Sequence, residues 1–299
     1  MIRIGYACIN TKLDPPNRTC RLKNATPEKI LELASANVAA LQPILEWNAA
    51  HDIEPFRITS DLIPFGSHPI NTVPWWRILK SQFVRLGEFI ASNHLRVSMH
   101  PGQFTILNSP RREVIANSVK ELEYHTAVLE ALGVDDSHKI VIHLGGIYGD
   151  KAESLSRFIE ICKTLASGIK ARLVIENDER CYTVTDALIA SKAIGVPVVF
   201  DVFHHIWNPP LDSVPVRSII GLAAKTWRKR DGRVKIHYSN QWPGGPAGAH
   251  SRSIHLGKFL RFYDSIHDLD IDIMLEVKDK QESVLKIFRA LRARQLRAA

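Results

Sequence analysis

Histidine and carboxylate residues stand at the carboxyl ends of a series of short hydrophobic segments that have the composition of β-strands. Six of them end a segment, directly follow it or lie one position before its end: His100, His143, Glu176, Asp201, His237 and Glu276. Three more histidines lie in the loops after these segments: His68, His204 and His250. Because parallel strands deliver their carboxyl ends to one face of a barrel, we expect these side chains to converge there.

A cluster of imidazole and carboxylate groups of this size predicts bound metal ions. Without cations the groups would repel one another, and each metal takes three or four ligands, so two or three divalent ions are expected. The cluster contains no cysteine, which favours Mn²⁺, Zn²⁺ or Fe²⁺ over a structural zinc site. Such ions can lower the pKa of bound water and so supply a nucleophile. We assign catalysis to Glu176, as a bridge between two metals, and to Asp201 and Glu276, which we expect to share the neighbouring metal with His237.

Lys235 precedes His237 by two residues in the same predicted strand. The period-two alternation of a strand points both side chains toward the interior of the barrel. An uncompensated ammonium beside divalent cations would be very costly. We therefore expect Lys235 to be neutral, paired with a carboxylate, or chemically converted to an anion, and we include it among the catalytic residues.

Strand-like and helix-like segments alternate along the whole chain. The predicted strands are Ile2 to Tyr6, Phe56 to Thr59, Leu95 to Met99, Lys139 to His143, Arg172 to Glu176, Pro197 to Asp201, Val234 to Tyr238 and Asp272 to Glu276. The predicted helices are Pro27 to Ala50, Trp75 to Asn93, Arg111 to Leu132, Ala152 to Ser167, Thr183 to Ala193, Val216 to Lys229, Ser253 to Asp268 and Gln281 to Arg294. This alternation predicts an α/β fold, a single (β/α)₈ TIM barrel over residues 1–299.

The composition narrows the class of protein. Hydrophobic residues make up 45% of the 299 residues, which is typical of a globular chain. The net charge of +8 favours a polyanionic partner. Without a signal peptide or an apolar run of membrane-spanning length, we expect a cytoplasmic protein with no membrane partner. The four cysteines contain no C-x-x-C pair and are expected to be free thiols.

Several of these segments together resemble the UV damage endonuclease family, UvsE/UVDE. The segments are His68, His100-Pro101-Gly102-Gln103, Val141-Ile142-His143-Leu144-Gly145-Gly146, Ile175-Glu176-Asn177-Asp178, Asp201-Val202-Phe203-His204-His205, Lys235-Ile236-His237-Tyr238-Ser239 and Leu275-Glu276-Val277-Lys278. The resemblance implies a TIM barrel related to endonuclease IV, a monomer with up to three metal ions, commonly Mn²⁺, and no organic cofactor. It implies cleavage of damaged double-stranded DNA immediately 5′ of cyclobutane pyrimidine dimers, 6-4 photoproducts and some abasic sites.

The resemblance also implies roles for single residues. All nine residues of the predicted cluster match the family's metal ligands, and Lys235 matches its carboxylated lysine. Gln103 and Phe104 match a Gln-Tyr pair that fills the space left by the extruded lesion, so Phe104 keeps the stacking face and lacks the hydroxyl. Tyr6 and Asn10 match positions that line the lesion pocket. Lys278, two residues past Glu276, is expected either to contact a phosphate as a point charge or to be a surface lysine without a specific role.

Three other functions fit parts of the sequence. An endonuclease IV-like apurinic/apyrimidinic endonuclease would share the fold and metals but have a pocket too small for two bases. A metal-dependent sugar isomerase would use a similar barrel mouth without salt-sensitive DNA binding. A non-catalytic DNA-damage binder would not require the nine ligand-type residues. Nicking of UV-irradiated plasmid beside plasmid with abasic sites separates the two nucleases.

Overall fold

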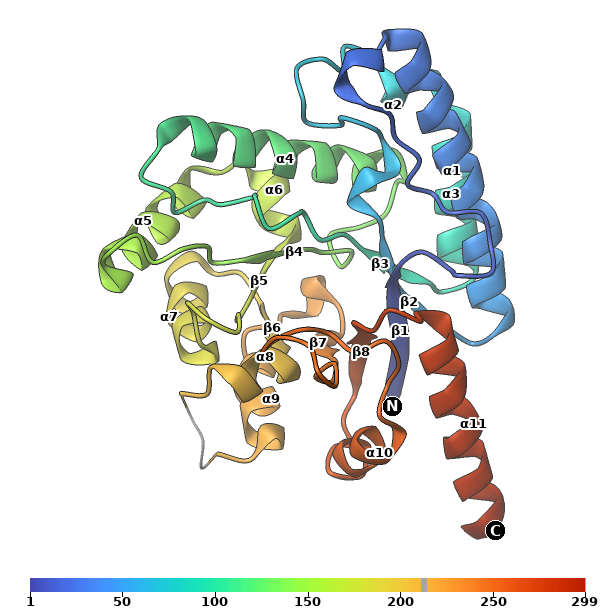
Figure 1. Cartoon of the computed structure of the whole chain (residues 1–299), viewed down its shortest axis with the longest axis vertical. Helices are drawn as coiled ribbons and strands as arrows, with labels where there is room; N and C mark the ends of the chain where they lie inside the picture. The colour runs from blue at the N-terminus through green and yellow to red at the C-terminus, as the bar shows by residue number, and fades with distance from the viewer. Residues whose placement is uncertain (211–213, 299) are drawn as a thin grey trace.

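Eight parallel strands form a barrel with helices around it (Figure 1), in a computed structural model that describes residues 1–210 and 214–298. The strands are β1 Ile2–Cys8, β2 Pro55–Ile58, β3 Arg96–Ser98, β4 Ile140–His143, β5 Leu173–Glu176, β6 Val198–Asp201, β7 Val234–Tyr238 and β8 Ile271–Leu275. Their order in the sheet is β3-β2-β1-β8-β7-β6-β5-β4. Between β3 and β4 the amide of Met99 donates to Lys139 O, and Val141 N donates to Met99 O, each at 2.9 Å. These bonds bring the two edge strands together, and the predicted TIM barrel is confirmed.

The helices that follow the strands cover the outside of the barrel. They are α1 Pro27–Ala50, α2 Trp75–Ile78, α3 Lys80–Ser92, α4 Arg112–Ala131, α5 Lys151–Thr164, α6 Ser167–Arg172, α7 Val184–Ile194, α8 Val202–Trp207, α9 Val216–Ala224, α10 Leu256–Asp264 and α11 Gln281–Ala298. Short 3₁₀ turns occur at Leu22–Asn24, Ser60–Leu62 and Lys229–Asp231. Most of the helix predictions agree with these bounds to within a few residues, as is usual at helix ends.

Three details of the helix predictions were wrong. The helix expected from Trp75 to Asn93 is divided at Leu79, whose backbone leaves the helical region. The six-residue helix α6 was not predicted. The helix α8 was also missed, because six residues are too few to show helical periodicity. It begins directly after β6, where the Asp201 carboxylate caps it by accepting a 2.6 Å hydrogen bond from His204 N.

The inside of the barrel is built in layers because alternate residues of each strand point inward. A middle layer contains Val141, Val174 and Val199, which pack with Trp227. On β5 and β6, the next inward positions toward the carboxyl ends are Glu176 and Asp201. The apolar layer therefore forms the floor beneath the predicted cluster.

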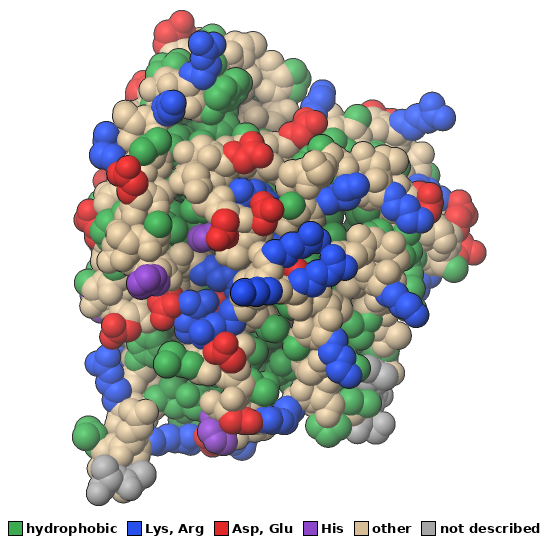
Figure 2. Space-filling model, turned by 180° about the vertical axis from the view of Figure 1, so that it is seen from behind, with side chains coloured by type: hydrophobic (Ala, Val, Ile, Leu, Met, Phe, Trp, Pro, Cys, Tyr) green, Lys and Arg blue, Asp and Glu red, His purple; other side chains and the backbone are tan. Residues whose placement is uncertain are grey.

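The amino-terminal layer of the barrel holds buried ion pairs. Asp272 accepts from Arg3 Nε and from Arg96 Nη1, each at 2.7 Å, and Lys139 donates to Asp231 at 2.6 Å. Figure 2, seen from behind Figure 1, shows Lys and Arg side chains gathered near the middle of that face with acidic side chains close by. Many of the cations are thus paired locally with acids, and the net charge by itself does not locate a DNA-binding face.

The cysteines and the hydrophobicity of the helices were the subject of two predictions from composition. Cys8, Cys20, Cys162 and Cys181 are free thiols, as predicted. Among the described residues, no helix combines the length and hydrophobicity needed to span a membrane.

Candidate metal centre

Eight of the nine predicted ligands lie together at the carboxyl ends of the strands. They form four overlapping groups of three residues, and within each group one ligand atom per residue lies within 4.8 Å of the others. The groups are His100, His143 and Glu176; Glu176, Asp201 and His204; Glu176, His237 and Glu276; and His204, His250 and Glu276. Glu176 belongs to three of the groups, so its carboxylate is the centre of the cluster.

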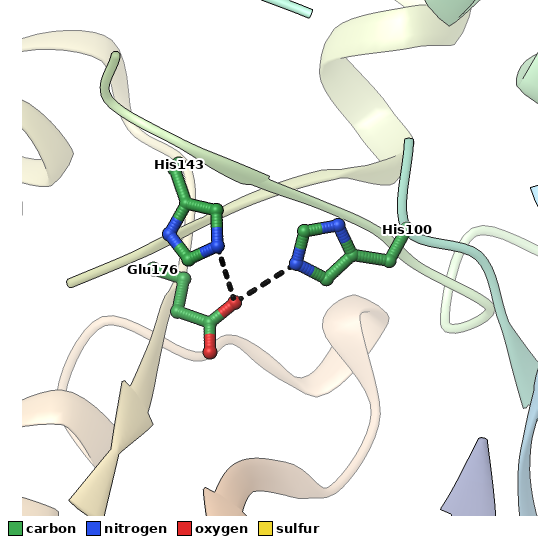
Figure 3. Close-up of side chains that lie close together, drawn as sticks. All are labelled: His100, His143 and Glu176. Carbon is green, nitrogen blue, oxygen red and sulfur yellow. Dashed lines mark hydrogen bonds and ion pairs between the residues drawn. The ribbon is translucent and has the colours of Figure 1, made fainter. Parts of the chain in front are cut away.

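The first group lies at the ends of three strands that follow one another in sequence, β3, β4 and β5. His100 Nε2 is 3.1 Å and His143 Nε2 is 3.8 Å from the same oxygen of Glu176, Oε2 (Figure 3). His100 Nδ1 lies 2.9 Å from the carbonyl of Pro101. A carbonyl can only accept, so Nδ1 carries the proton and the Nε2 lone pair is free to bind a cation.

A buried carboxylate oxygen without a hydrogen-bond donor marks the second group. Asp201 is fully buried, and while its Oδ1 caps α8, its Oδ2 has no hydrogen-bond partner in the described part of the chain. His204 Nε2 lies 3.9 Å from this oxygen. An unpaired anionic oxygen in the interior is costly, and a bound cation would remove that cost. The site therefore fits a metal ion by its own chemistry.

The remaining two groups join β5, β7, the helix α8 and the loops after β7 and β8. His237 Nδ1 is 2.5 Å from Glu176 Oε1 and 3.4 Å from Glu276 Oε1. His250 Nδ1 is 3.9 Å from Glu276 Oε2 and 2.8 Å from the Glu276 carbonyl. These two groups extend the cluster from the barrel axis toward the loop that carries His250.

Burial and mutual repulsion set the protonation states of the cluster. The pKa of Glu176 is raised well above its ordinary value by burial and by the neighbouring carboxylates of Glu276 and Asp201. Burial, followed by the Arg57 charge, lowers the pKa of His100 to about 4, and burial beside other imidazoles lowers the pKa of His143 to about 3. The two histidines are therefore neutral near pH 7, which is the form that binds metals.

Arg57, from β2, belongs to the site and was missed by the sequence analysis. Its buried Nη2 donates to Glu276 Oε1 and lies 3.0 Å from His237 Nε2. Burial alone would raise the pKa of Glu276, but Arg57 and His237 outweigh burial and hold this pKa well below its usual range. The alternation of strand residues predicts that Arg57 points inward. Arginine is not a metal-ligand type, however, so the pattern of ligand residues did not include it.

Glu179 is a second residue that the sequence analysis missed. It lines the cleft above the cluster, and its Oε2 lies 3.4 Å from His204 Nδ1. Burial lowers the pKa of His204, but Asp201, Glu276 and Glu179 together raise it above its ordinary value. A carboxylate behind the second nitrogen of a histidine ligand orients the ring toward the metal. No spacing rule singles out Glu179 in the sequence.

His68 is the predicted ligand that the structure does not bring into the cluster. It is exposed in the loop after β2 and belongs to none of the four ligand groups found among the described residues. Its Nδ1 accepts a 3.1 Å hydrogen bond from Ile70 N. The assignment of His68 as a metal ligand stays a prediction.

Lys235 points into the barrel as expected, but it lies one layer below the ligands. On β7 it is in register with Asp272 of the charged layer, whereas His237 pairs with Met274. Its Nζ is fully buried and has no hydrogen-bond partner among the described residues. Burial and the charge of Arg96 lower its pKa well below the ordinary value. Among the described residues no carboxylate pairs with Nζ, and Asp272 is bound by Arg3 and Arg96, so the structure gives no support to the alternative of a carboxylate-paired lysine.

A cleft of about 480 Å³ opens above the metal ligands. Gln103 lines this cleft, and Phe104 beside it is 70% exposed. Tyr6 and Asn10 do not line it. Both are buried and hydrogen-bonded to other residues, because Tyr6 donates to Asn48 Oδ1 at 2.7 Å and Asn10 donates to the Tyr6 hydroxyl at 3.3 Å. Their assignment to a lesion pocket stays a prediction.

The last predicted DNA-binding residue, Lys278, lies outside this cleft. It is exposed in the loop after β8, and its Nζ is 4.1 Å from the centre of the Trp242 ring. The assignment to a phosphate contact also stays a prediction.

Known proteins resemble this chain over nearly its whole length. Residues 2–297 match the family described as UV-endonuclease UvdE. The UV DNA damage endonuclease of Clostridium perfringens is 43% identical over 293 residues, which are 97% of this chain and 71% of that protein. The crystal structure of SacUVDE has a TM-score of 0.92 and 40% identity over 99% of both chains. Endonuclease IV from Thermus thermophilus, at 17% identity and a TM-score of 0.57, shares the fold. The barrel with its cluster of histidine and carboxylate side chains is thus that of a member of the UvdE family of UV endonucleases.

Proposed function

We propose that this endonuclease hydrolyses the phosphodiester bond immediately 5′ of cyclobutane pyrimidine dimers, 6-4 photoproducts and some abasic sites in double-stranded DNA, and that it requires a cluster of metal ions. The observation that carries this proposal is the group of eight ligand-type side chains around Glu176 at the mouth of the barrel. Family membership supplies the DNA substrate, and the curated relatives are named UV DNA damage endonucleases.

The proposal includes two or three divalent ions, with Mn²⁺ preferred and Zn²⁺ or Fe²⁺ as alternatives. The residues that would hold them are His100, His143, Glu176, Asp201, His204, His237, His250 and Glu276, with His68 as a further predicted ligand. Bound ions would lower the pKa of water and stabilise charge on the attacking and leaving oxygens. The protein's contribution is to present His100 and His143 as neutral imidazoles, to fix the shared carboxylate of Glu176, and to leave an open cleft on one side for the phosphodiester.

We also propose that Lys235 is carboxylated on Nζ in the active protein. The neutral amine attacks carbon dioxide, the new N–C bond forms as one C=O π bond opens, and the released proton leaves to solvent, so that a carbamate anion replaces a neutral amine. The surroundings support this conversion, because Arg57 and Arg96 both disfavour a protonated lysine at this position. A carbamate anion would be attracted to Arg57 and Arg96, both of which would repel a protonated lysine. The carbamate would extend from the charged layer of the barrel toward the layer of metal ligands above it.

The loop after β3 is proposed to probe the lesion. An enzyme that acts on a base inside a duplex must extrude it, and side chains fill the space that the base leaves. Gln103 at the cleft and the exposed ring of Phe104 are placed for this role. A poorly stacked photoproduct costs less to extrude than intact bases, so selectivity does not require the protein to read base edges.

The test compares nicking of three plasmids by the purified protein: UV-irradiated, carrying abasic sites, and undamaged. The expected result is Mn²⁺-dependent nicking of the irradiated plasmid, loss of nicking with a chelator, and recovery on addition of Mn²⁺. Mapping of the break should place it directly 5′ of the photoproduct. Nicking confined to abasic sites would replace the proposal with an endonuclease IV-like activity. Nicking of neither damaged plasmid in the metal-loaded protein would overturn it.

A further inference from the structure

The loop after β7 and the loop after β8 lie side by side next to the metal centre. Lys278 N donates to the carbonyl of Ser251 at 3.2 Å, and Asp279 N donates to the carbonyl of Arg252 at 2.8 Å. The two candidate ligands at the start of this pairing are also joined, since His250 Nδ1 is 2.8 Å from the Glu276 carbonyl. The pairing therefore runs from the metal centre outward to Arg252 and Lys278.

These loops line a groove of about 610 Å³ that is separate from the metal cleft. Its lining is Thr11, Trp242, Arg252, Lys278, Asp279 and Glu282. Both acids already have partners, because Asp279 accepts from the Ser283 hydroxyl at 2.6 Å and Glu282 pairs with Lys12 at 2.7 Å. Neither cation of the lining forms an ion pair with a carboxylate among residues 1–210 and 214–298. Lys12 neutralises Glu282, whereas the hydroxyl on Asp279 leaves the charge of that carboxylate in place. The lining therefore carries two unpaired cations beside one carboxylate, and its net positive charge suits an anion.

Trp242 holds one of these cations in place. Its ring lies under the Lys278 ammonium, and Gly245 packs so closely on the same ring that a Cβ there would lie 3.0 Å from it. The backbone on either side is fixed, with Trp242 N donating to Ala249 O at 2.7 Å and the Gln241 amide donating to Pro246 O at 2.8 Å. A cation–π contact orients the ammonium without neutralising its charge. Lys278 therefore remains available to an anionic ligand.

The two cations of the groove follow candidate metal ligands closely along the chain. Arg252 follows His250 by two residues and Lys278 follows Glu276 by two residues. Two residues of chain span about 7 Å at most, so the backbone of each cation lies close to the backbone of a candidate ligand. An anion between these cations would therefore lie beside the metal cleft.

We propose that Arg252 and Lys278 form a phosphate subsite for the DNA strand that is cut, beside the metal cleft that would hold the scissile phosphate, and that Trp242 is a positioning residue for Lys278. The subsite rests on the proposed function, because it takes its ligand from the same strand. The subsite adds Arg252 and Trp242 to the DNA-binding surface. In the loop after β7, His250 would face the metals and Arg252 would face the DNA backbone.

The experiment measures binding of a lesion-bearing duplex and its undamaged twin over a range of KCl concentrations, with Ca²⁺ in place of Mn²⁺. Arg252→Ala and Lys278→Ala should each reduce the slope of log K against log salt by about 0.9, and the double variant by about 1.8. Between 50 and 200 mM salt, each contact corresponds to about a 3.5-fold smaller loss of affinity. The matched control is Lys192→Ala, an exposed cation at the far end of α7, which should leave the slope unchanged. An unchanged slope in the double variant would overturn the subsite.

The role of Trp242 is tested by a double-mutant cycle. Trp242→Ala should weaken binding and reduce the slope in the wild-type background, yet it should change little when Lys278 is already alanine. Trp242→Phe retains an aromatic face and should stay close to wild type. Equal losses in both backgrounds would show that the ring contacts DNA directly and would overturn the positioning role.

The subsite and the proposed function can fail separately. Wild-type nicking of the irradiated plasmid tests the function, and the salt slopes test the subsite. If wild type nicks but the double variant keeps the wild-type slope, the subsite alone is wrong. If the slopes fall as expected but no damaged plasmid is nicked, the function alone is wrong. Wild type that binds neither duplex would overturn both.

Discussion

The guanidinium of Arg57 lies against the carboxylate of Glu276 at the edge of the metal cluster, and both side chains are more than four-fifths buried. A buried cation among groups that resemble metal ligands compensates negative charge whether or not a metal is bound. Arg57 therefore contributes to the charge balance of the site. It also makes the stability of the protein depend on how the charge of Glu276 is balanced.

Replacing Arg57 should therefore destabilise the metal-free protein more than the metal-loaded one. Removing one partner of a buried ion pair costs about 3 to 5 kcal/mol, because the other charge is left unpaired. For Arg57→Gln we expect a loss of this size without metal and a larger stabilisation by Mn²⁺ than in wild type. The measurement is urea unfolding with chelator and with Mn²⁺, and Arg57→Lys, which keeps the charge, is the control. The same Mn²⁺ effect in wild type and Arg57→Gln would contradict the role.

The central carboxylate should be essential for chemistry and much less important for binding DNA. Glu176→Ala removes the oxygens shared by three ligand groups, so nicking of irradiated plasmid should be abolished while binding of damaged duplex is largely kept. Metal content is measured on the same preparation. Near wild-type cleavage with a full complement of metal would rule out the ligand assignment.

Glu179 should act through His204 on metal affinity. Loss of the partner of a histidine ligand typically reduces metal affinity 10- to 100-fold, and Glu179→Gln keeps the size of the side chain while removing its charge. We expect a Mn²⁺ affinity lower by about this factor, measured by equilibrium dialysis. Glu153→Gln, an exposed carboxylate on α5, serves as the control. Wild-type affinity in Glu179→Gln would show that Glu179 does not orient the ring.

The sequence predicted the parts of the site that depend on strand register. His100, His143, Glu176 and Asp201 could be placed because each ends or directly follows a recognisable strand, and the carboxyl ends of parallel strands meet at one face. His204 could be included because it lies three residues from Asp201, although the helix that carries it was not foreseen. The closed barrel could also be predicted, because the sequence contains eight strand-like segments that alternate with helix-like segments.

What the sequence did not predict depends on contacts across the barrel. The link from Arg57 to Glu276 joins residues 219 positions apart, and Glu179 matters because of where His204 points. Tyr6, by contrast, was expected at the cleft and does not line it. It ends a predicted strand, yet the alternation that turns Lys235 inward turns Tyr6 outward, where it packs against Phe56 and donates to Asn48 of α1. Its place at the strand end did not bring it to the cleft.

Acid should destabilise the fold through His138, which lies outside the metal centre. His138 Nδ1 accepts a 3.1 Å hydrogen bond from Val97 N, and burial lowers its pKa to about 4. The unfolded chain, with a pKa of about 6.5, binds the proton first, so this contribution is complete above pH 6.5 and is lost as the pH falls toward 4. Linkage gives about 2 kcal/mol between pH 7 and pH 5.

The variant that tests this contribution is His138→Asn, whose side-chain oxygen can still accept from Val97 N but does not titrate. Its free energy of unfolding should fall by about 2 kcal/mol less than that of wild type between pH 7 and pH 5. Both proteins are unfolded in urea with a chelator present, so that the metal ligands contribute equally. Parallel pH profiles for the two proteins would contradict the assignment.

The loop after β3 offers the sharpest test of lesion recognition, because Phe104 is exposed and can be changed without disturbing the core. Stacking of an aromatic side chain on a base is worth roughly 1 to 3 kcal/mol, so Phe104→Ala should weaken binding of a lesion-bearing duplex by about one to two decades. Binding of the undamaged twin should change little, since it depends on contacts to phosphates. Phe104→Tyr keeps the stacking face and should bind like wild type. All three proteins are compared on both duplexes at one salt concentration, and equal losses on the two duplexes for Phe104→Ala would mean that the loop grips the backbone rather than the lesion.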